Sequence, residues 1–199
     1  MSAPRLRYLS HPQVVIDPDV PVPDWPLNDV GRARITALAD VVRDRLPRTT
    51  SVWSSPERKA LDTAYILAPA IDCEVRIAAD SHENDRSSTG FLPADAFEAA
   101  ADQFFGTPDV AFRGWETAQD AQNRILNSIK SMILQAPDGD LLVIGHGAVG
   151  TLLFCAAKGI PISRTHDQGP TGGGNILDFD RQTLGITREW VALETYFGV

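Results

Sequence analysis

The chain has 199 residues, of which 43% are hydrophobic and 22% charged, with a formal net charge of −8 and a pI of about 4.9. This size and composition predict one globular domain spanning residues 1–199. The acidic balance argues against nucleic acid as a partner, so an anionic substrate would need local positive charge from arginines or helix N-termini.

Two cysteines, Cys73 and Cys155, are too few and too far apart for a disulfide framework, and neither has the spacing of a metal ligand. The first residues contain no apolar segment typical of a secretory signal. The longest apolar run, residues 148–157, is about half of the ~20 residues that a bilayer span requires. We therefore expect a reduced, cytoplasmic protein with no membrane partner.

The first half of the chain alternates strands and helices. Residues 5–10 form a short apolar strand that stops on a histidine, and the Pro- and Asp-rich residues 12–26 predict a loop over a pocket mouth. A helix capped by Asn28 then runs to Pro47. A buried strand at residues 50–53 leads to Ser54-Ser55-Pro56, where we expect a second helix with Pro56 in its first turn.

The second half continues this alternation. The pattern predicts strands at 74–77 and 140–145 and a closing strand pair at 176–179 and 186–193. It predicts helices at 94–105, from 117 with a capping box of Thr117 and Asp120, and at 149–157, where the helix is apolar. A polar loop is expected at 81–90 and a flexible glycine-rich turn at 169–174.

Strands that alternate with helices predict an α/β fold, a three-layer sandwich with a mostly parallel central sheet and helices on both faces. In such sheets ligands bind beyond the carboxyl ends of the strands. His11 and His146 both follow predicted strands, so two imidazoles can face one pocket although most of the chain separates them. The alternatives are that His11 merely caps loop carbonyls and that Gly145-His146-Gly147 is only a tight turn.

Arg58 and Lys59 lie in the expected first turn of the second helix. A cation is unfavourable beside the positive end of a helix dipole, so anion binding would explain the pair, and solvated surface charge is the alternative. Glu83 lies in the polar loop with Arg86 three residues later. A carboxylic acid can protonate a leaving oxygen if burial raises its pKa, although a charged loop equally suits a solvated carboxylate.

In this order the segments resemble the histidine phosphatase superfamily, which has the phosphoglycerate mutase-like fold. Ser10-His11-Pro12 resembles the family's Arg-His-Gly, and residues 54–64 resemble its Ser-Ser-x-x-x-Arg-Ala-x-x-Thr-Ala segment. Gly145-His146-Gly147-Ala148 is similar to the family's Ser-His-Gly-Gly. The resemblance covers nearly the whole chain, and the ordered set is far more specific than any single motif.

The resemblance implies phosphoryl transfer through a phosphohistidine on His11, without a metal or another cofactor. In it Glu83 would protonate the leaving oxygen and His146 would hold the phosphoryl oxygens. The expected substrate-binding residues are Ser10, Arg58, Lys59, Arg86 and Gly147.

The chain departs from the family pattern where the family binds phosphate. Ser10 stands in place of an arginine, Pro12 in place of a glycine, and Lys59 in place of a second arginine, with Arg58 one position earlier. Each lost charge-assisted hydrogen bond to a buried anion costs about 1.5–3 kcal/mol. We hypothesise that Arg86 compensates, because it lies only three residues from Glu83.

The leading prediction is a phosphatase acting on a small phosphorylated metabolite. A mutase on the same fold is disfavoured because it must bind two phosphate groups in a pocket that has lost positive charge. The remaining alternatives are a catalytically weak binding module and a metal-dependent hydrolase, for which the usual close pair of ligands on one element is missing. The sequence leaves open the identity of the substrate and the oligomeric state, with a homodimer as one option.

Overall fold

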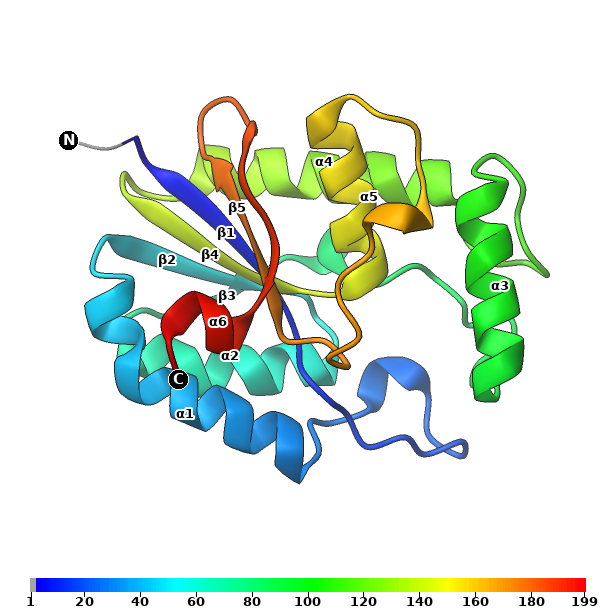
Figure 1. Cartoon of the computed structure of the whole chain (residues 1–199), viewed down its shortest axis with the longest axis horizontal. Helices are drawn as coiled ribbons and strands as arrows, with labels where there is room; N and C mark the ends of the chain where they lie inside the picture. The colour runs from blue at the N-terminus through cyan, green and yellow to red at the C-terminus, as the bar shows by residue number, and fades with distance from the viewer. Residues whose placement is uncertain (1–2) are drawn as a thin grey trace.

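The computed structural model describes residues 3–199, and its centre is one sheet with the strand order β3-β2-β4-β1-β5-β6 (Figure 1). The strands are β1 (Arg5–Ser10), β2 (Thr49–Ser54), β3 (Val75–Ile77), β4 (Asp140–Gly145), β5 (Asn175–Asp180) and β6 (Ile186–Ala192). Strands β1 to β4 pair in parallel, while β5 is antiparallel to both β1 and β6. The mostly parallel α/β sheet expected from the sequence is confirmed.

Helices cover both faces of the sheet, which gives three layers (Figure 1). The helices are α1 (Asp29–Arg45), α2 (Arg58–Ala70), α3 (Ala94–Gly106), α4 (Ala118–Gln135), α5 (Gly147–Lys158) and α6 (Leu193–Phe197), with single 3-10 turns at η1 (Val22–Asp24), η2 (Ala79–Ser81) and η3 (Arg164–His166). Helices α1, α2 and α6 pack on one face, and α4 and α5 pack on the other. Helix α3 stands beyond the sheet and contacts η3.

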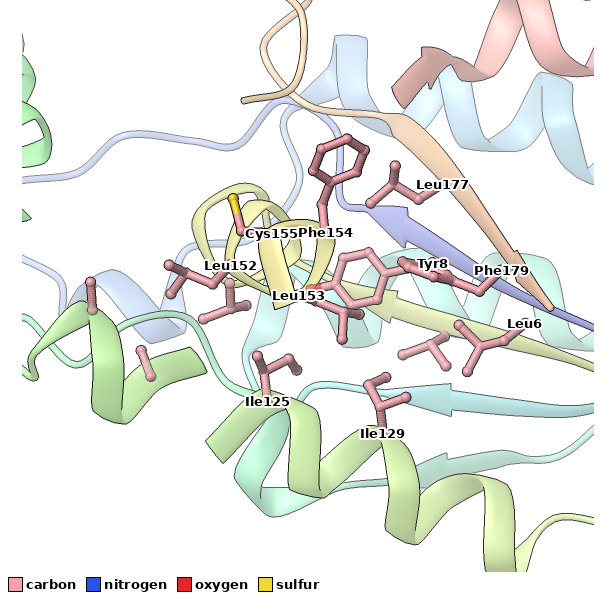
Figure 2. Packing of buried hydrophobic residues seen from close by; sticks show 14 of the residues in the cluster. Leu6, Tyr8, Ile125, Ile129, Leu152, Leu153, Phe154, Cys155, Leu177 and Phe179 are labelled. Atoms are coloured by element: carbon pink, nitrogen blue, oxygen red, sulfur yellow. The ribbon is translucent and has the colours of Figure 1, made fainter. Parts of the chain in front are cut away.

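The apolar strands of the centre are buried because both of their faces meet helices. In β4, Leu141 and Val143 face the α4–α5 side, and the alternate residues Leu142 and Ile144 face the α1–α2 side. Figure 2 shows the hydrophobic core on the α4–α5 side of the sheet, where side chains of β1 meet those of α4 and α5. A strand buried on both faces holds its carboxyl end in a fixed position, as a site at that end requires.

The helix starts follow local capping rules, with one correction. The Asn28 side chain accepts a hydrogen bond from the Gly31 N–H, and Thr117 accepts one from the Asp120 N–H, as expected. The start of the second helix was predicted wrongly. Helix α2 begins at Arg58, with Glu57 at the N-cap, because the Ser55 hydroxyl accepts from the Glu57 N–H and forms a turn before the helix.

Both cysteines are free thiols, and they lie in the hydrophobic layers on opposite faces of the sheet. Cys73 is half-buried after α2, and Cys155 is fully buried in α5. Over residues 3–199 we find no helix that combines the length and the apolar character needed to cross a bilayer.

Candidate active site

The two predicted histidines meet at the carboxyl ends of neighbouring parallel strands. Ser10 of β1 pairs with Gly145 of β4, and the His11 N–H donates to the Gly145 carbonyl over 2.9 Å. This register brings the imidazole rings of His11 and His146 to a centroid separation of 5.1 Å, edge to face. Both rings line one pocket of about 250 Å³, and Lys59, Glu83, Arg86 and Gly147 line it with them.

His11 has a fixed protonation pattern. Its Nδ1 lies 2.8 Å from the Pro12 carbonyl oxygen. Because a carbonyl can only accept, Nδ1 carries the proton and Nε2 keeps its lone pair. Burial, reinforced by the nearby Lys59 cation, lowers the pKa of His11 to about 4. The ring is therefore neutral and nucleophilic near neutral pH.

His146 is fully buried and its backbone is held by Tyr8 of β1. The Tyr8 hydroxyl accepts from the His146 N–H over 2.9 Å and donates to the His146 carbonyl over 3.1 Å. A Cβ at Gly145 would lie 2.1 Å from that hydroxyl oxygen, so the glycine before His146 is a packing requirement. In the ring, Nε2 lies 2.7 Å from Ser55 Oγ, whereas the buried Nδ1 has no partner among the described residues.

Glu83 joins its loop to the N-terminus of α5. Its carboxylate accepts hydrogen bonds from the backbone N–H groups of Asn84, Ala148 and Val149 over 3.0–3.2 Å. Burial and the neighbouring Glu57 carboxylate raise the pKa of Glu83, and these N–H groups only partly offset the rise. A raised pKa suits a carboxyl group that must give up a proton near neutral pH.

Arg124 of α4 holds this loop in place, and sequence reasoning did not find it. Its guanidinium donates to the carbonyls of His82 and Glu83 over 2.9 and 3.2 Å, and it forms an ion pair with Glu116. Arg124 lies within α4, and Glu116 lies just before this helix begins at Ala118. The Glu83 carbonyl that Arg124 contacts is 41 positions upstream. Only the tertiary fold brings them together.

Glu57 is the second residue that sequence reasoning missed. It is buried and forms an ion pair with Lys59, whose ammonium also donates to the Val22 carbonyl over 2.8 Å. Glu57 accepts from the Glu83 N–H over 2.8 Å and lies 3.7 Å from His146 Nε2. Burial opposes its ionisation, but the Lys59 ammonium and the hydrogen bonds from Lys59 and the Glu83 N–H lower the pKa of Glu57, so it stays a carboxylate. The lysine charge in the pocket is thus largely compensated.

Arg86 is the cation of this pocket that has no counter-ion. Its guanidinium lies over the Phe97 ring of α3, 4.8 Å from the centroid. Within residues 3–199 it makes no hydrogen bond and no ion pair, and burial lowers its pKa. Arg164 also lines the pocket, but it is ion-paired with Glu98 and Asp102.

Two of the predicted substrate-binding residues do not line the pocket. The Ser10 hydroxyl is buried beneath it, donating to Gln168 Oε1 over 2.6 Å and accepting from the Asn175 N–H over 3.0 Å. Arg58 is exposed and ion-paired with Asp62 at 2.7 Å. One helix position turns a side chain by about 100°, so the helix start at Arg58 directs Lys59, not Arg58, inward.

The glycine-rich segment at residues 169–174 forms the predicted turn. This turn packs against the backbone of His11. Gly173 has a φ of 86°, and a Cβ there would lie 2.2 Å from the His11 carbonyl oxygen. The Gly174 N–H donates to the carbonyls of Ser10 and His11, each over 3.1 Å. The segment therefore fixes the chain on both sides of the histidine.

The described residues contain no cluster of three or more His, Cys, Asp or Glu side chains arranged to hold a metal ion. The pocket combines two neutral imidazoles, a carboxyl group with a raised pKa and the basic side chains of Lys59, Arg86 and Arg164. In His146, as in His11, burial lowers the pKa. This set can supply a nucleophile, an acid and hydrogen-bond donors for an anion.

The sequence model of a protein family, the histidine phosphatase superfamily (branch 1), matches residues 20–190 of this chain. This chain belongs to that superfamily. The match begins after His11, where the chain departs from the family's Arg-His-Gly pattern. A comparison with curated protein sequences gives no significant match.

Solved structures of histidine phosphatase type share the fold at low identity. A mycobacterial glucosyl-3-phosphoglycerate phosphatase with bound inorganic phosphate is 20% identical, with a TM-score of 0.77 over 96% of this chain and 99% of that one. The YhfR protein of Bacillus stearothermophilus is 20% identical, with a TM-score of 0.78 over 94% and 95%. A putative alpha-ribazole-5'-P phosphatase of Escherichia coli is 18% identical, with a TM-score of 0.65 over 96% and 97%.

Proposed function

We propose that this member of the histidine phosphatase superfamily hydrolyses a small phosphomonoester through a phosphohistidine on His11. The observation that carries the proposal is the state of the His11 ring. Its Nδ1 proton is committed to the Pro12 carbonyl, so the free Nε2 lone pair faces a pocket that also holds His146 and Glu83. The phosphatases named among the similar structures act on phosphorylated metabolites, which supports this substrate class.

In the first step Nε2 of His11 attacks phosphorus and the bond from phosphorus to the ester oxygen breaks. Glu83 gives its proton to that leaving oxygen and becomes a carboxylate. Its Oε2 accepts one N–H bond and Oε1 accepts two, so Oε2 has more room to carry the transferred proton. Nδ1 keeps its proton and continues to donate it to the Pro12 carbonyl oxygen, and this hydrogen bond stabilises the charged phosphoimidazole.

In the second step water attacks the phosphohistidine, and the Glu83 carboxylate accepts the proton of the water. The bond from phosphorus to Nε2 breaks, inorganic phosphate forms, and neutral His11 and protonated Glu83 are restored. The cycle therefore balances with one carboxyl group that acts first as an acid and then as a base. It needs no group outside the chain's own residues and water.

In this proposal four groups that line the pocket bind the phosphoryl oxygens: Lys59, Arg86, the Gly147 N–H and His146. Ser55 Oγ accepts from the Glu57 N–H, so its own proton can go to His146 Nε2. His146 then carries its proton on Nδ1, the ring nitrogen that has no partner within residues 3–199. Arg86 would take over part of the role of the family arginine that Ser10 replaces.

A catalytically weak phosphate-binding module is the second candidate, and the Glu57–Lys59 pair favours it. Donors to the transferring phosphoryl group provide most of the rate enhancement in phosphoryl transfer. Here one family arginine is replaced by the buried Ser10, and the lysine at the other position is compensated by a carboxylate. A mutase fits less well, because it needs a second phosphate site and exclusion of water.

Hydrolysis of a panel of aryl phosphates, with and without a chelator, separates these candidates. We expect chelator-insensitive turnover that His11→Ala abolishes. Binding of inorganic phosphate without turnover of any ester would instead identify the binding module, and loss of activity on chelation would identify a metal-dependent hydrolase. Arg58→Ala, which changes an exposed cation outside the pocket, is the control for a general effect of charge removal.

A further inference from the structure

A second cavity of about 710 Å³ adjoins the pocket of the histidines. The two cavities share Val22, Glu83, Asn84 and Arg86, and neither His11 nor His146 lines the second one. Glu83 and Arg86 therefore stand on the boundary, with the two imidazoles on one side and the larger cavity on the other. The proposed phosphatase reaction does not yet use this space.

The geometry of phosphoryl transfer indicates that the second cavity lies on the leaving-group side of phosphorus. The attacking and leaving atoms lie roughly in line on opposite sides of phosphorus. When His11 attacks, the leaving oxygen lies on the side of phosphorus away from His11, where Glu83 must reach it. The remainder of the leaving alcohol then extends past Glu83, and the adjoining cavity is the space that lies there.

The walls of this cavity are apolar and its rim is acidic. Pro21, Pro23 and Pro56 with Val22 provide rigid apolar surface. Asp24 is exposed on the rim, and hydrogen bonds from Ser87 lower the pKa of Asp85, which keeps it ionised near neutral pH. Apolar walls favour an apolar ligand, and two rim carboxylates repel a negatively charged one.

The cations near this cavity do not offset its acidic rim. Among the described residues that line it, Arg86 is the one basic side chain besides His82, and it lies on the boundary where the phosphoryl group binds. Lys59 lines the other pocket and is paired with Glu57. A second acid group on the leaving alcohol would thus meet Asp24 and Asp85, neither of which forms an ion pair within residues 3–199.

We propose that the adjoining cavity binds the leaving group, and that the substrates are phosphomonoesters of apolar alcohols or phenols without a second acidic group. This inference rests on the proposed phosphatase activity. It disfavours bisphosphates and esters of hydroxy acids, because their second anion would lie against Asp24 and Asp85.

Three aryl phosphates of similar size test the inference: para-ethylphenyl, para-(carboxymethyl)phenyl and para-(aminomethyl)phenyl phosphate. We expect kcat/KM for the ethyl ester to exceed that for the carboxymethyl ester by about tenfold or more, since charges a few ångströms apart interact strongly at a protein surface. The aminomethyl ester should react at least as fast as the ethyl ester. High salt should reduce the differences.

The double variant Asp24→Asn/Asp85→Asn should reduce the preference for the ethyl over the carboxymethyl ester to about threefold or less. Asp19→Asn, an exposed carboxylate of the same loop outside the cavity, should leave the preference unchanged. Equal or faster turnover of the carboxymethyl ester, or an unchanged preference in the double variant, would overturn the inference while the phosphatase stands. No turnover of any ester would overturn the proposed function and this inference with it.

Discussion

Charged side chains gather in two regions of the sheet, and the two regions differ in how completely these side chains are paired. Near the amino ends of β1 and β4, Arg7 donates to Asp140 and to the Tyr196 hydroxyl, each over 2.9 Å. The Tyr196 hydroxyl in turn donates to the buried Asp178 over 2.8 Å, and Arg5 forms an ion pair with the same carboxylate. Every charge in this network has a partner.

The carboxyl ends of the same strands carry groups that lack partners. Within residues 3–199, His146 Nδ1 is buried without a hydrogen bond, and the Arg86 guanidinium has no counter-ion. Buried polar groups without a partner also occur at Thr49, Ser51, Trp53 and Trp190, but His146 and Arg86 differ from these because they line one pocket, where a ligand can reach them. The comparison teaches that pairing, more than residue type, separates the structural cluster from the candidate active site.

Glu83→Gln should produce the largest effect on the reaction. Glutamine cannot donate a proton as an acid does, so we expect kcat for phenyl phosphate to fall about 10²–10⁴-fold. The loss should be smaller for para-nitrophenyl phosphate, whose leaving group needs less protonation. The amide oxygen can replace Oε1 and accept from the Val149 N–H, whereas the amide nitrogen cannot accept from the Ala148 N–H, so the midpoint of thermal unfolding should fall only by the loss of about one hydrogen bond. A loss below about threefold with both esters would remove Glu83 from the mechanism.

Arg7→Ala should affect stability and leave the chemistry alone. Removing one partner of a buried ionic network typically costs about 3–5 kcal/mol, because Asp140 and Asp178 lose their most buried cationic partner and keep only more exposed arginines. Urea denaturation should show this loss, while kcat of the folded protein stays within about twofold of wild type. Arg43→Ala, which breaks an exposed pair with Asp72, is the matched control. A large fall in kcat with unchanged stability would contradict the division between the two regions.

Arg86→Met should lower kcat/KM about 10- to 100-fold, the effect of removing one charge-assisted hydrogen bond to the phosphoryl group. Methionine retains an apolar side chain against Phe97, so the α3 packing should survive. Arg58→Met removes an arginine that lies outside the pocket and should leave kcat/KM unchanged. Equal effects of the two substitutions would show that general positive charge, not the placement of Arg86, matters.

The two buried histidines of the candidate active site should make the free energy of unfolding depend on pH, an effect smaller than those of the substitutions above. Burial lowers the pKa of His11 from 6.5 to about 4 and also lowers that of His146. Between these values the unfolded chain binds protons that the folded chain excludes, so the free energy of unfolding falls as the pH drops from about 6.5 toward 4. His11→Asn should reduce this slope in denaturation curves recorded across that range. An identical slope in the variant would mean that His11 is not held neutral by the fold.

The overall fold and both histidines could be predicted from the sequence, because each depends on local patterns. Alternating strands and helices predict the layers, and a histidine directly after a buried strand lies where the strand ends. His11 and His146 lie together because β1 and β4 pair in a register that aligns Ser10 with Gly145. These features are encoded within short segments of the chain.

The electrostatics of the pocket could not be predicted in the same way. Glu57 lies two residues before Lys59, a spacing that occurs on any solvated surface, and its burial depends on Val22 and Glu83. The start of α2 depends on the hydroxyl of Ser55 and decides whether Arg58 or Lys59 points inward. One cue was present in the sequence: a carboxylate beside a basic residue in a Ser-Ser-Pro segment suggests that the charge is compensated.

The central claim is a covalent phosphohistidine at residue 11, and a quenched reaction tests it most directly. Glu83→Gln with para-nitrophenyl phosphate should favour accumulation, because the good leaving group departs without an acid while the second step lacks its base. Mass spectrometry of peptides digested without acid should find one phosphoryl group on His11, and none in His11→Ala. Turnover without a phosphoryl group on His11, or activity retained in His11→Ala, would contradict the account.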